Sequence, residues 1–276
     1  AREIKRFVRE RYAGLAREKA GSCCSSSSTP SPSCCAPRVT PGEVQTCAGA
    51  LYTEEELETL PKEMSDISWG CGNPTAIAGL REGEVVLDLG SGGGIDCFLA
   101  AQRVGVGGRV IGLDMTPEMV SLARENAKKM GINNVEFRLG EMEHMPVESN
   151  SIDVIISNCV INLSPDKDAV FREAFRVLKP GGRLCVSDIV LLQKLPPEIK
   201  ESLDQWAGCV AGALDKKLYL DKLLAAGFVN ASTEEKSIPV LIERATAKTQ
   251  DSEESQPYLD LRGKVASVNV KAFKPV

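Results

Sequence analysis

The sequence predicts an α/β fold, with a mostly parallel sheet and helices on both faces, and three observations predict it. Short apolar runs alternate with segments of helical periodicity from residue 84 onward, as in strand–helix–strand units. The first apolar run leads directly into a glycine-rich turn. The last run alternates apolar and polar residues, which is typical of an antiparallel strand with one buried face.

The first fifty residues are expected to form a helix followed by an arm. Apolar residues recur at helical spacing within residues 3–19, among Arg and Lys, which predicts an amphipathic helix. They are Ile4, Phe7, Val8, Tyr12 and Leu15. In residues 21–50, Ser, Pro and Cys replace most large apolar side chains. Burial of so few apolar side chains cannot offset the conformational entropy that the chain would lose on folding, so we expect a mobile arm there.

Strands and helices then follow in order. Buried strands are predicted at VVLDL (85–89), RVIGLD (109–114), VEFRL (135–139), IDVIISN (152–158) and RLCVSDI (183–189). Helices are predicted from Thr116-Pro117 to just before Gly131, from about Pro165 to Leu178 ahead of the turn KPGG, and within residues 197–226. Thr53 and Glu56 have the spacing of a capping box that opens a short helix. VASVNVKAF (265–273) is the expected final antiparallel strand.

Composition narrows the class of protein. The 276 residues are 43% hydrophobic, and no apolar run approaches the ~20 residues that cross a bilayer. The net charge of -5 argues against nucleic acid or anionic lipid as partner, so we expect small molecules. The first residues contain no apolar signal-peptide core, which predicts a cytoplasmic protein. Ten cysteines beside one histidine indicate metal or redox chemistry.

The glycine-rich turn is the first candidate binding element. In DLGSGGGIDC, Asp88 ends the first strand, and the turn that follows contains Gly90, Ser91, Gly92, Gly93 and Gly94. Such glycines let backbone N–H groups approach a ligand, although a tight strand-to-helix turn also explains them. Asp114 ends the second strand, where a carboxylate can accept both ribose hydroxyls of a nucleoside. Met115 follows it and joins the candidate cofactor residues.

Two further strand ends face the same crevice. Glu141 and Met142 follow the third strand, where they either cover an adenine face or begin a helix with a core methionine. Asn158 ends the fourth strand, and its amide either holds the amino acid end of the ligand or orients a substrate.

Taken in order, the glycine turn, the acidic second-strand end and the KPGG turn resemble the class I S-adenosylmethionine-dependent methyltransferases over residues 80–190. The resemblance implies a Rossmann-like, seven-stranded sheet and S-adenosylmethionine as cofactor. It also implies that Gly90 to Gly94 wrap the methionine portion and that Asp114 holds the ribose.

Three cysteines lie in distinctive segments: Cys71 in WGCGNP, Cys159 in SNCVINL and Cys209 in QWAGCVAGAL. Cys159 directly follows Asn158, so its thiol is expected near the transferred methyl group. A buried cysteine is also a small inert hydrophobe, which is our reading of Cys97 and Cys185. Thiolates suit soft metals and metalloids, whereas a zinc site would more often show CxxC pairs or several histidines.

With these segments the chain resembles the arsenite S-adenosylmethionine methyltransferases along residues 50–230. The resemblance implies that Cys71, Cys159 and Cys209 bind trivalent arsenic, free or as a thiol conjugate. It also implies a catalytic relay through a more N-terminal cysteine. Cys47 lies nearest in sequence, and Cys23, Cys24, Cys34 and Cys35 stay open as alternatives.

The implied chemistry needs no base, because arsenic bound by three thiolates keeps a lone pair that can attack the methyl group. The methyl cation oxidises the arsenic, so we expect a protein dithiol to return the electrons and thioredoxin or glutathione to reduce the resulting disulfide. We expect a monomer. The regions expected are an arm at 1–50, the cofactor-binding core at 51–190, and arsenic-site helices with C-terminal strands at 191–276.

Two other functions fit the same sequence. A carbon methyltransferase for a small organic acceptor, such as a quinone precursor, would explain the glycine turn and leave the three cysteines as packing residues. A soft-metal-binding protein without transfer activity would keep the fold and the thiols.

Overall fold

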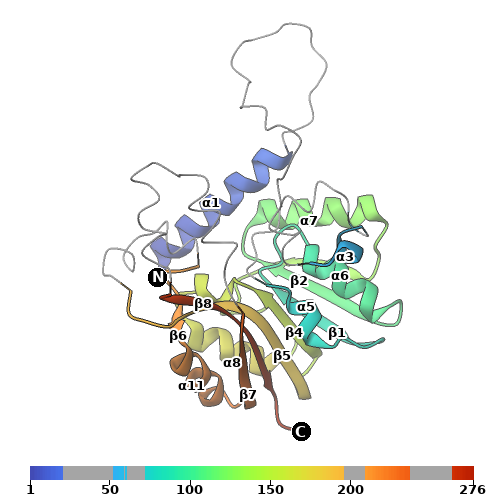
Figure 1. The fold of residues 1–276 in the computed structure, drawn as a ribbon. Coiled ribbons are helices and arrows are strands. Elements are labelled where there is room, and N and C mark those ends of the chain that lie inside the picture. Colours follow the sequence, from blue (N-terminus) through green and yellow to red (C-terminus); the bar gives the residue numbers. More distant parts are fainter. Residues whose placement is uncertain (21–51, 59, 61–71, 196–208, 237–262) are drawn as a thin grey trace, which may run out of the picture.

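The computed structural model describes residues 1–20, 52–58, 60, 72–195, 209–236 and 263–276. Within these ranges the strands form one sheet in the order β3-β2-β1-β4-β5-β8-β7, and a short strand, β6, pairs only with β5. The first five strands of that order run parallel, and β8 pairs antiparallel with both β5 and β7 (Figure 1). This path of seven strands confirms the predicted α/β fold.

The strand positions agree with the sequence pattern at β1, β2, β3, β4 and β8, whereas β5 begins at Leu178 and runs through the KPGG segment that was expected to be a turn, and β6 and β7 were not predicted. The strands are β1 (Val85–Leu89), β2 (Arg109–Asp114), β3 (Val135–Leu139), β4 (Ile152–Asn158), β5 (Leu178–Leu191), β6 (Leu214–Asp215), β7 (Val229–Lys236) and β8 (Val265–Phe273). The prediction that residues 135–139 are a buried strand is wrong about burial: β3 ends the sheet, and only Phe137 in it is buried. At the other edge, the polar sequence of β7 carried no strand signal.

Helices cover both faces of the sheet, as predicted. Helices α8 (Lys167–Val177) and α11 (Lys216–Ala225) pack on one face, and α5 (Pro74–Ala78), α6 (Ile95–Val104) and α7 (Pro117–Met130) pack on the other (Figure 1). The helix expected within 197–226 is present only as α11 in the described part of that range, because residues 209–213 are not helical and residues 214–215 form β6. Residues 196–208 lie outside the described residues.

Helix ends follow the capping signals of the sequence. Helix α7 begins at Pro117 and stops at Gly131, whose left-handed backbone lets its N–H return to the carbonyls of Ala127 and Lys128. Helix α3 (Glu54–Glu58) has the predicted capping box: the Thr53 amide donates to Glu56 at 3.0 Å, and the Glu56 amide donates to the Thr53 hydroxyl at 3.2 Å.

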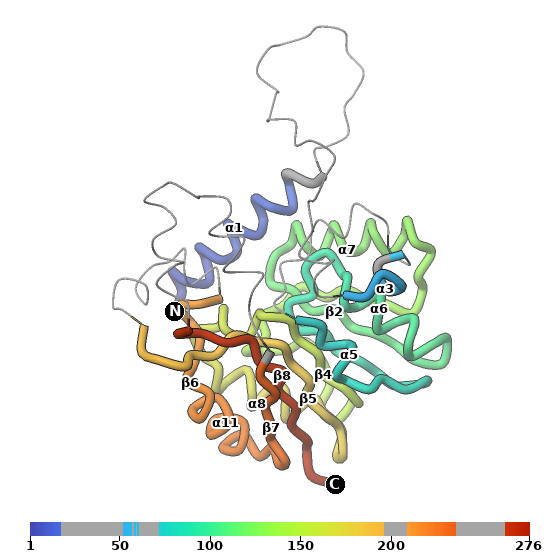
Figure 2. Tube along the Cα trace, in the orientation of Figure 1, coloured from blue at the N-terminus to red at the C-terminus, as the bar shows by residue number. Residues whose placement is uncertain are grey.

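Helix α1 (Arg2–Ala20) confirms the amphipathic N-terminal helix. Val8, Ala13 and Ala16 on its apolar side are buried. The helix runs across the molecule toward α7 (Figure 2), and Arg17 forms an ion pair with Glu118 of α7 at 2.6 Å. The arm expected at 21–50 lies outside the described residues, and the three-region division stays a prediction.

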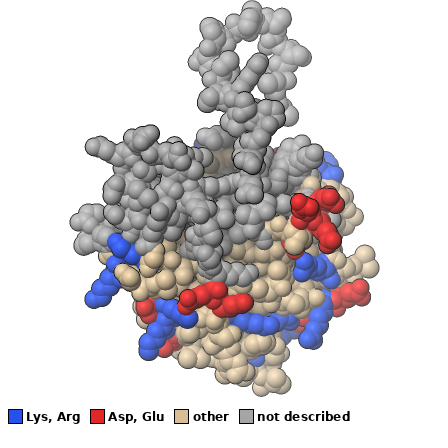
Figure 3. Space-filling view, viewed as in Figure 1, with Lys and Arg blue, Asp and Glu red and all other residues tan. Residues whose placement is uncertain are grey.

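On the face shown in Figure 3, the described Lys and Arg side chains are interspersed with Asp and Glu. None of the helices in the described ranges combines the length and apolar character needed to cross a membrane.

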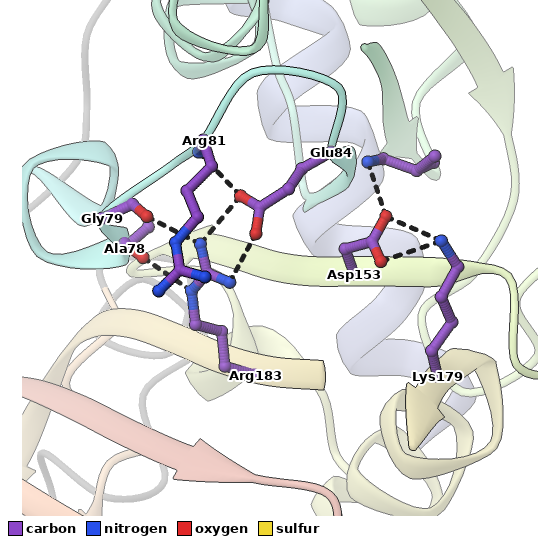
Figure 4. Close-up of polar contacts among 8 residues, drawn as sticks. Ala78, Gly79, Arg81, Glu84, Asp153, Lys179 and Arg183 are labelled. Carbon is purple, nitrogen blue, oxygen red and sulfur yellow. Dashed lines mark hydrogen bonds and ion pairs between the residues drawn. The ribbon is translucent and has the colours of Figure 1, made fainter. Parts of the chain in front are cut away.

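A bidentate ion pair between Arg183 and Glu84 joins the start of β1 to β5 and α5 (Figure 4). Arg183 donates to both Glu84 oxygens at 2.8 and 2.9 Å and to the carbonyls of Ala78 and Gly79 at the end of α5. Burial raises the pKa of Glu84, but the hydrogen bonds from Arg183 and from the Arg81 amide, together with the charge of Arg183, leave the pKa below its ordinary value. The pair therefore stabilises the fold mainly at pH values where glutamate is ionised in the unfolded chain.

Replacing Arg183 by Ala should lower the free energy of unfolding by about 1.5–3 kcal/mol at neutral pH, because Glu84 loses its charged hydrogen bonds and is left partly buried without its cation. Lys179→Ala is the matched control, since its ion pair with Asp153 is more exposed and should contribute about 1 kcal/mol or less. Denaturant unfolding across a pH series measures both. The Arg183→Ala deficit should shrink as acid protonates Glu84, and a deficit that stays constant through the carboxylate range would contradict this role.

Candidate functional site

The glycine turn between β1 and α6 is fastened to the neighbouring strand and helix. The amides of Gly90 and Ser91 donate to the carbonyl of Leu113 at 2.7 and 3.0 Å. The Gly92 amide donates to the Asp114 carboxylate at 2.9 Å, and the Asn126 amide group donates to the Gly93 carbonyl at 3.0 Å. The turn is therefore held rigidly beside the end of β2.

Glycine is required at two positions of this turn. Gly90 has φ +71°, and a Cβ there would overlap the Val160 side chain. Gly94 has φ +97°, and a Cβ there would lie 2.8 Å from the ring of Phe98. Other residues rarely adopt such backbone angles, and the neighbours leave no space for a side chain. The chain after β4 can therefore approach the turn closely.

A cavity lies between this turn, the strand ends and α1. It holds about 1050 Å³ of space not filled by protein atoms, open solvent at its mouth included. The predicted site residues that line it are Gly90, Ser91, Gly92, Gly93, Asp114, Met115, Met142, Asn158, Cys159 and Cys209. The structure therefore gathers predicted residues from five separate parts of the sequence around one space.

Three predicted residues lie outside the lining. Gly94 packs on Phe98 as described. Asp88 is buried and accepts a hydrogen bond from the Cys97 thiol at 3.2 Å, while burial and the nearby charge of Asp96 raise its pKa well above the ordinary value. The Glu141 carboxylate is paired with Lys5 at 2.7 Å and with Arg9 at 3.2 Å. Cys47 and Cys71 fall outside the described residues.

The Asp114 carboxylate is fixed by backbone donors. The Thr116 amide donates to one oxygen at 2.8 Å and the Gly92 amide to the other at 2.9 Å. Burial raises the pKa of Asp114, and these two hydrogen bonds work in the opposite direction. A carboxylate has about four acceptor positions, so Asp114 can accept hydroxyl groups of a ligand beside these backbone donors.

Cys159 and Cys209 meet in the cavity wall. The Cys209 thiol donates to the Cys159 carbonyl at 2.7 Å, although the two residues are 50 positions apart. Both are buried, and neither forms a disulfide. Their φ angles are +65° and +67°, a left-handed conformation that costs a non-glycine residue energy. Such strain often occurs where a site must aim a particular side chain.

Helix α1 contributes residues to this site that the sequence analysis did not assign. Lys5, Val8 and Tyr12 line the cavity. Burial raises the pKa of Tyr12 well above its ordinary value, and negative charge at Cys209 and Cys159 raises it further. Tyr12 was visible in the sequence only as one member of an apolar stripe.

Ion pairs hold α1 in place over the cavity. Lys5 contacts Glu141 at 2.7 Å and the buried Glu143 at 3.0 Å, and Ser164 donates to Glu143 at 2.6 Å. Because Glu143 is buried, its contact with Lys5 is screened less by solvent than a surface pair. The helix therefore forms part of the cavity wall.

A second unassigned group is a buried polar network around Asp96, in the first turn of α6. The Tyr52 hydroxyl donates to one Asp96 oxygen at 3.1 Å, and the Asn158 amide donates to the other at 3.2 Å. The Asn158 amide also donates to the Gly72 carbonyl at 2.7 Å, and the Gly72 amide donates back to the Asn158 oxygen at 3.2 Å. The side chain of Asn158, the residue that precedes Cys159, therefore ties the chain at Gly72 to the end of β4.

Within the described ranges, no three Cys, His, Asp or Glu side chains are grouped so as to hold a metal ion. Cys159 and Cys209 are two of the three ligands expected from the sequence, and both residues line the cavity.

Comparison with known proteins agrees with this geometry. The methyltransferase domain family matches residues 80–228, which is more than half of the chain. The chain belongs to this family. Its methyltransferase domain spans the sheet from β1 to the loop before β7, and therefore includes the glycine turn, Asp114, Cys159 and Cys209.

Curated relatives and a solved structure extend the likeness. The chain is 46% identical to an arsenite methyltransferase of Halobacterium salinarum over 232 residues. This matched region is 82% of this chain and 57% of that protein. It is 40% identical over 174 residues to the arsenite methyltransferase of Mus musculus, covering 59% and 45%. An arsenic(III) S-adenosylmethionine methyltransferase structure from Chlamydomonas reinhardtii matches with TM-score 0.63 and 34% identity, over 80% of this chain and 72% of that one. The chain thus spans about half the length of the curated relatives it matches.

Proposed function

We propose that the protein transfers methyl groups from S-adenosylmethionine to trivalent arsenic held by cysteine thiolates. The observation that carries the proposal is the meeting of Cys159 and Cys209 in the wall of the cavity that the glycine turn also lines. If the methyl acceptor were an organic molecule, these two thiols and the left-handed backbone conformation of both residues would have no function in the reaction.

The residues present fit S-adenosylmethionine. The Ser91 hydroxyl lies in the cavity lining, and its oxygen is buried without a hydrogen-bond partner among the described residues, so it is available to a polar ligand group. Asp114 keeps acceptor positions for ribose hydroxyls. Met115 and Met142 supply polarisable apolar surface suited to an adenine face. The bound cofactor would supply an activated methyl carbon on its sulfonium.

The thiols would bind and orient the arsenic. Each thiolate replaces an oxygen ligand of arsenite, and arsenic bound by three thiolates keeps a lone pair directed at the methyl carbon. No proton has to be removed from such an acceptor, so the site requires no general base. Positioning can account for much of the rate, since a well-oriented pair can gain about 7–11 kcal/mol over free reactants.

We assign the third ligand to Cys71. Support comes from Gly72, the next residue in the chain, whose amide and carbonyl are both bonded to the side chain of Asn158. Gly72 is thereby held at the side chain of the residue that precedes Cys159, whereas Cys71 itself lies outside the described residues.

The reductant and the relay cysteine are part of the proposal. Transfer of a methyl cation oxidises arsenic from the trivalent to the pentavalent state. A dithiol returns two electrons and becomes a disulfide, which thioredoxin or glutathione then reduces. Cys47, or one of the cysteines at 23, 24, 34 and 35, would form that disulfide. The monomeric state is proposed as well, and the cytoplasmic location stays a prediction from the sequence.

The test is to incubate the purified protein with arsenite, a thiol and S-adenosylmethionine labelled in the methyl group. Labelled methylated arsenicals, identified by mass spectrometry, are the expected product. Arsenite binding without any methylated arsenical would instead indicate a metalloid-binding protein. Label transferred to a demethylated quinone precursor, and none to arsenic, would indicate the carbon methyltransferase.

A further inference from the structure

Asp96 is a buried carboxyl group that faces the cavity. Its side chain is 8% exposed and lines the cavity beside Tyr52 and Asn158. Among the described residues, no Lys, Arg or His lies within ion-pair distance of it. Buried carboxylates are normally paired with a cation, because burial of an isolated charge is costly. The start of α6 offsets only part of that cost, since a helix N-terminus carries a partial positive charge.

The hydrogen bonds that reach Asp96 leave acceptor capacity unused. Tyr52 supplies one proton. The Asn158 amide has two protons but three acceptors within reach, namely the Gly72 carbonyl, the Tyr52 oxygen and Asp96. The carbonyl is the nearest of these at 2.7 Å, so the bond from Asn158 to Asp96 at 3.2 Å is one of several that this amide group makes. A carboxylate with about four acceptor positions therefore has room for further donors.

The neighbouring Asp88 does not compete for this role. It lies outside the cavity lining, is 2% exposed and bonds to the Cys97 thiol. Burial, and then the charge of Asp96, raise the pKa of Asp88 well above its ordinary value, whereas burial raises the pKa of Asp96 only to about 6. The Asp88 pKa is therefore raised further than that of Asp96, and only Asp96 of the two lines the cavity.

We propose that Asp96 binds the α-ammonium group of the cofactor's methionine portion, held in position by Tyr52 and Asn158. The inference rests on the proposed function, because it requires a cofactor that carries an amino acid end. The ammonium group would supply the cation that the buried carboxylate lacks, and its three protons match the open acceptor positions. Asp96 would thereby anchor the methionine end on the Asn158 side of the cavity, next to Cys159.

Calorimetric titration with two ligands tests this. The first is S-adenosylhomocysteine, and the second is its deaminated analogue, in which hydrogen replaces the ammonium group. The unmodified protein should bind the first roughly 10- to 100-fold more tightly, as loss of a charged hydrogen bond predicts. In Asp96→Asn that preference should fall to about threefold or less, chiefly through weaker binding of S-adenosylhomocysteine. Asp88→Asn, the matched control, should keep the preference of the unmodified protein.

The outcomes separate two failures. If the unmodified protein does not bind S-adenosylhomocysteine, both the proposed function and this inference are overturned. If it binds but Asp96→Asn keeps the full preference, or Asp88→Asn loses it instead, only the assignment of Asp96 is overturned. A crystal structure of the unmodified protein with S-adenosylhomocysteine gives a test that does not depend on how the variants fold. Its α-nitrogen should lie within hydrogen-bond distance of the Asp96 carboxylate, and a nitrogen placed elsewhere overturns the assignment.

Discussion

Replacing Cys159 by Ser is expected to lower the rate of arsenic methylation by roughly 100-fold or more while S-adenosylhomocysteine binds within about threefold of its normal affinity. The Cys159 thiol lies in the wall of the cavity, and its carbonyl also accepts the hydrogen bond from Cys209. Serine keeps the size and the backbone but offers a hard oxygen in place of a soft sulfur. The substrate therefore loses a ligand, whereas the cofactor residues keep their positions.

Cys185→Ser is the matched control for this variant. Cys185 is equally buried, in β5, but does not line the cavity. The Cys185→Ser variant should therefore be somewhat less stable than the unmodified protein but should methylate arsenite at the normal rate. Initial rates with arsenite, together with calorimetric cofactor binding, measure both variants. If Cys159→Ser and Cys185→Ser methylate arsenite at similar rates, the thiol at 159 is a packing residue and the arsenic site lies elsewhere.

Gly90→Ala should have the second largest effect, with an unfolding free energy lowered by about 2–5 kcal/mol and cofactor affinity reduced roughly tenfold or more. Gly90 has φ +71°, and an added Cβ would collide with Val160, the residue after Cys159. Relief of the collision must move either the glycine turn or the segment that holds the thiol. One methyl group would therefore disturb the cofactor side and the arsenic side of the cavity together.

Gly131→Ala separates the collision from the backbone strain. Gly131 has a similar φ of +67° at the end of α7, with nothing within 4 Å of an added Cβ. The Gly131→Ala variant should have a free energy of unfolding lowered by about 1–2 kcal/mol and should bind the cofactor normally. Denaturant unfolding and calorimetry measure both variants, and equal losses of stability with equal cofactor binding would show that the close approach of Val160 to the turn has no functional role.

Local signals in the sequence predicted most elements of the fold. The Thr116-Pro117 start and the Gly131 end located α7 correctly, and Thr53 with Glu56 located the start of α3. The strand β7 could not be predicted, because VNASTEEK lacks apolar alternation and lies at an edge, where only β8 pairs with it along the sheet path.

The site was predictable to the extent that its residues belong to contiguous segments. The glycine turn and Asp114 followed from their positions at strand ends. Asp96 stands in the same segment, but its partner Tyr52 lies 44 residues away, so no sequence spacing reveals the pair. The meeting of Cys159 and Cys209 likewise depends on the folded chain. Cys71 and Cys47 lie outside the described residues, and their roles stay predictions.

The most direct test of the central claim is the X-ray absorption spectrum of arsenic in a stoichiometric complex of the protein with arsenite. The account predicts arsenic bonded only to sulfur, with three sulfur neighbours in the unmodified protein and one fewer in Cys159→Ser and in Cys209→Ser. Arsenic that keeps its oxygen neighbours, or a sulfur count unchanged in both variants, would contradict it.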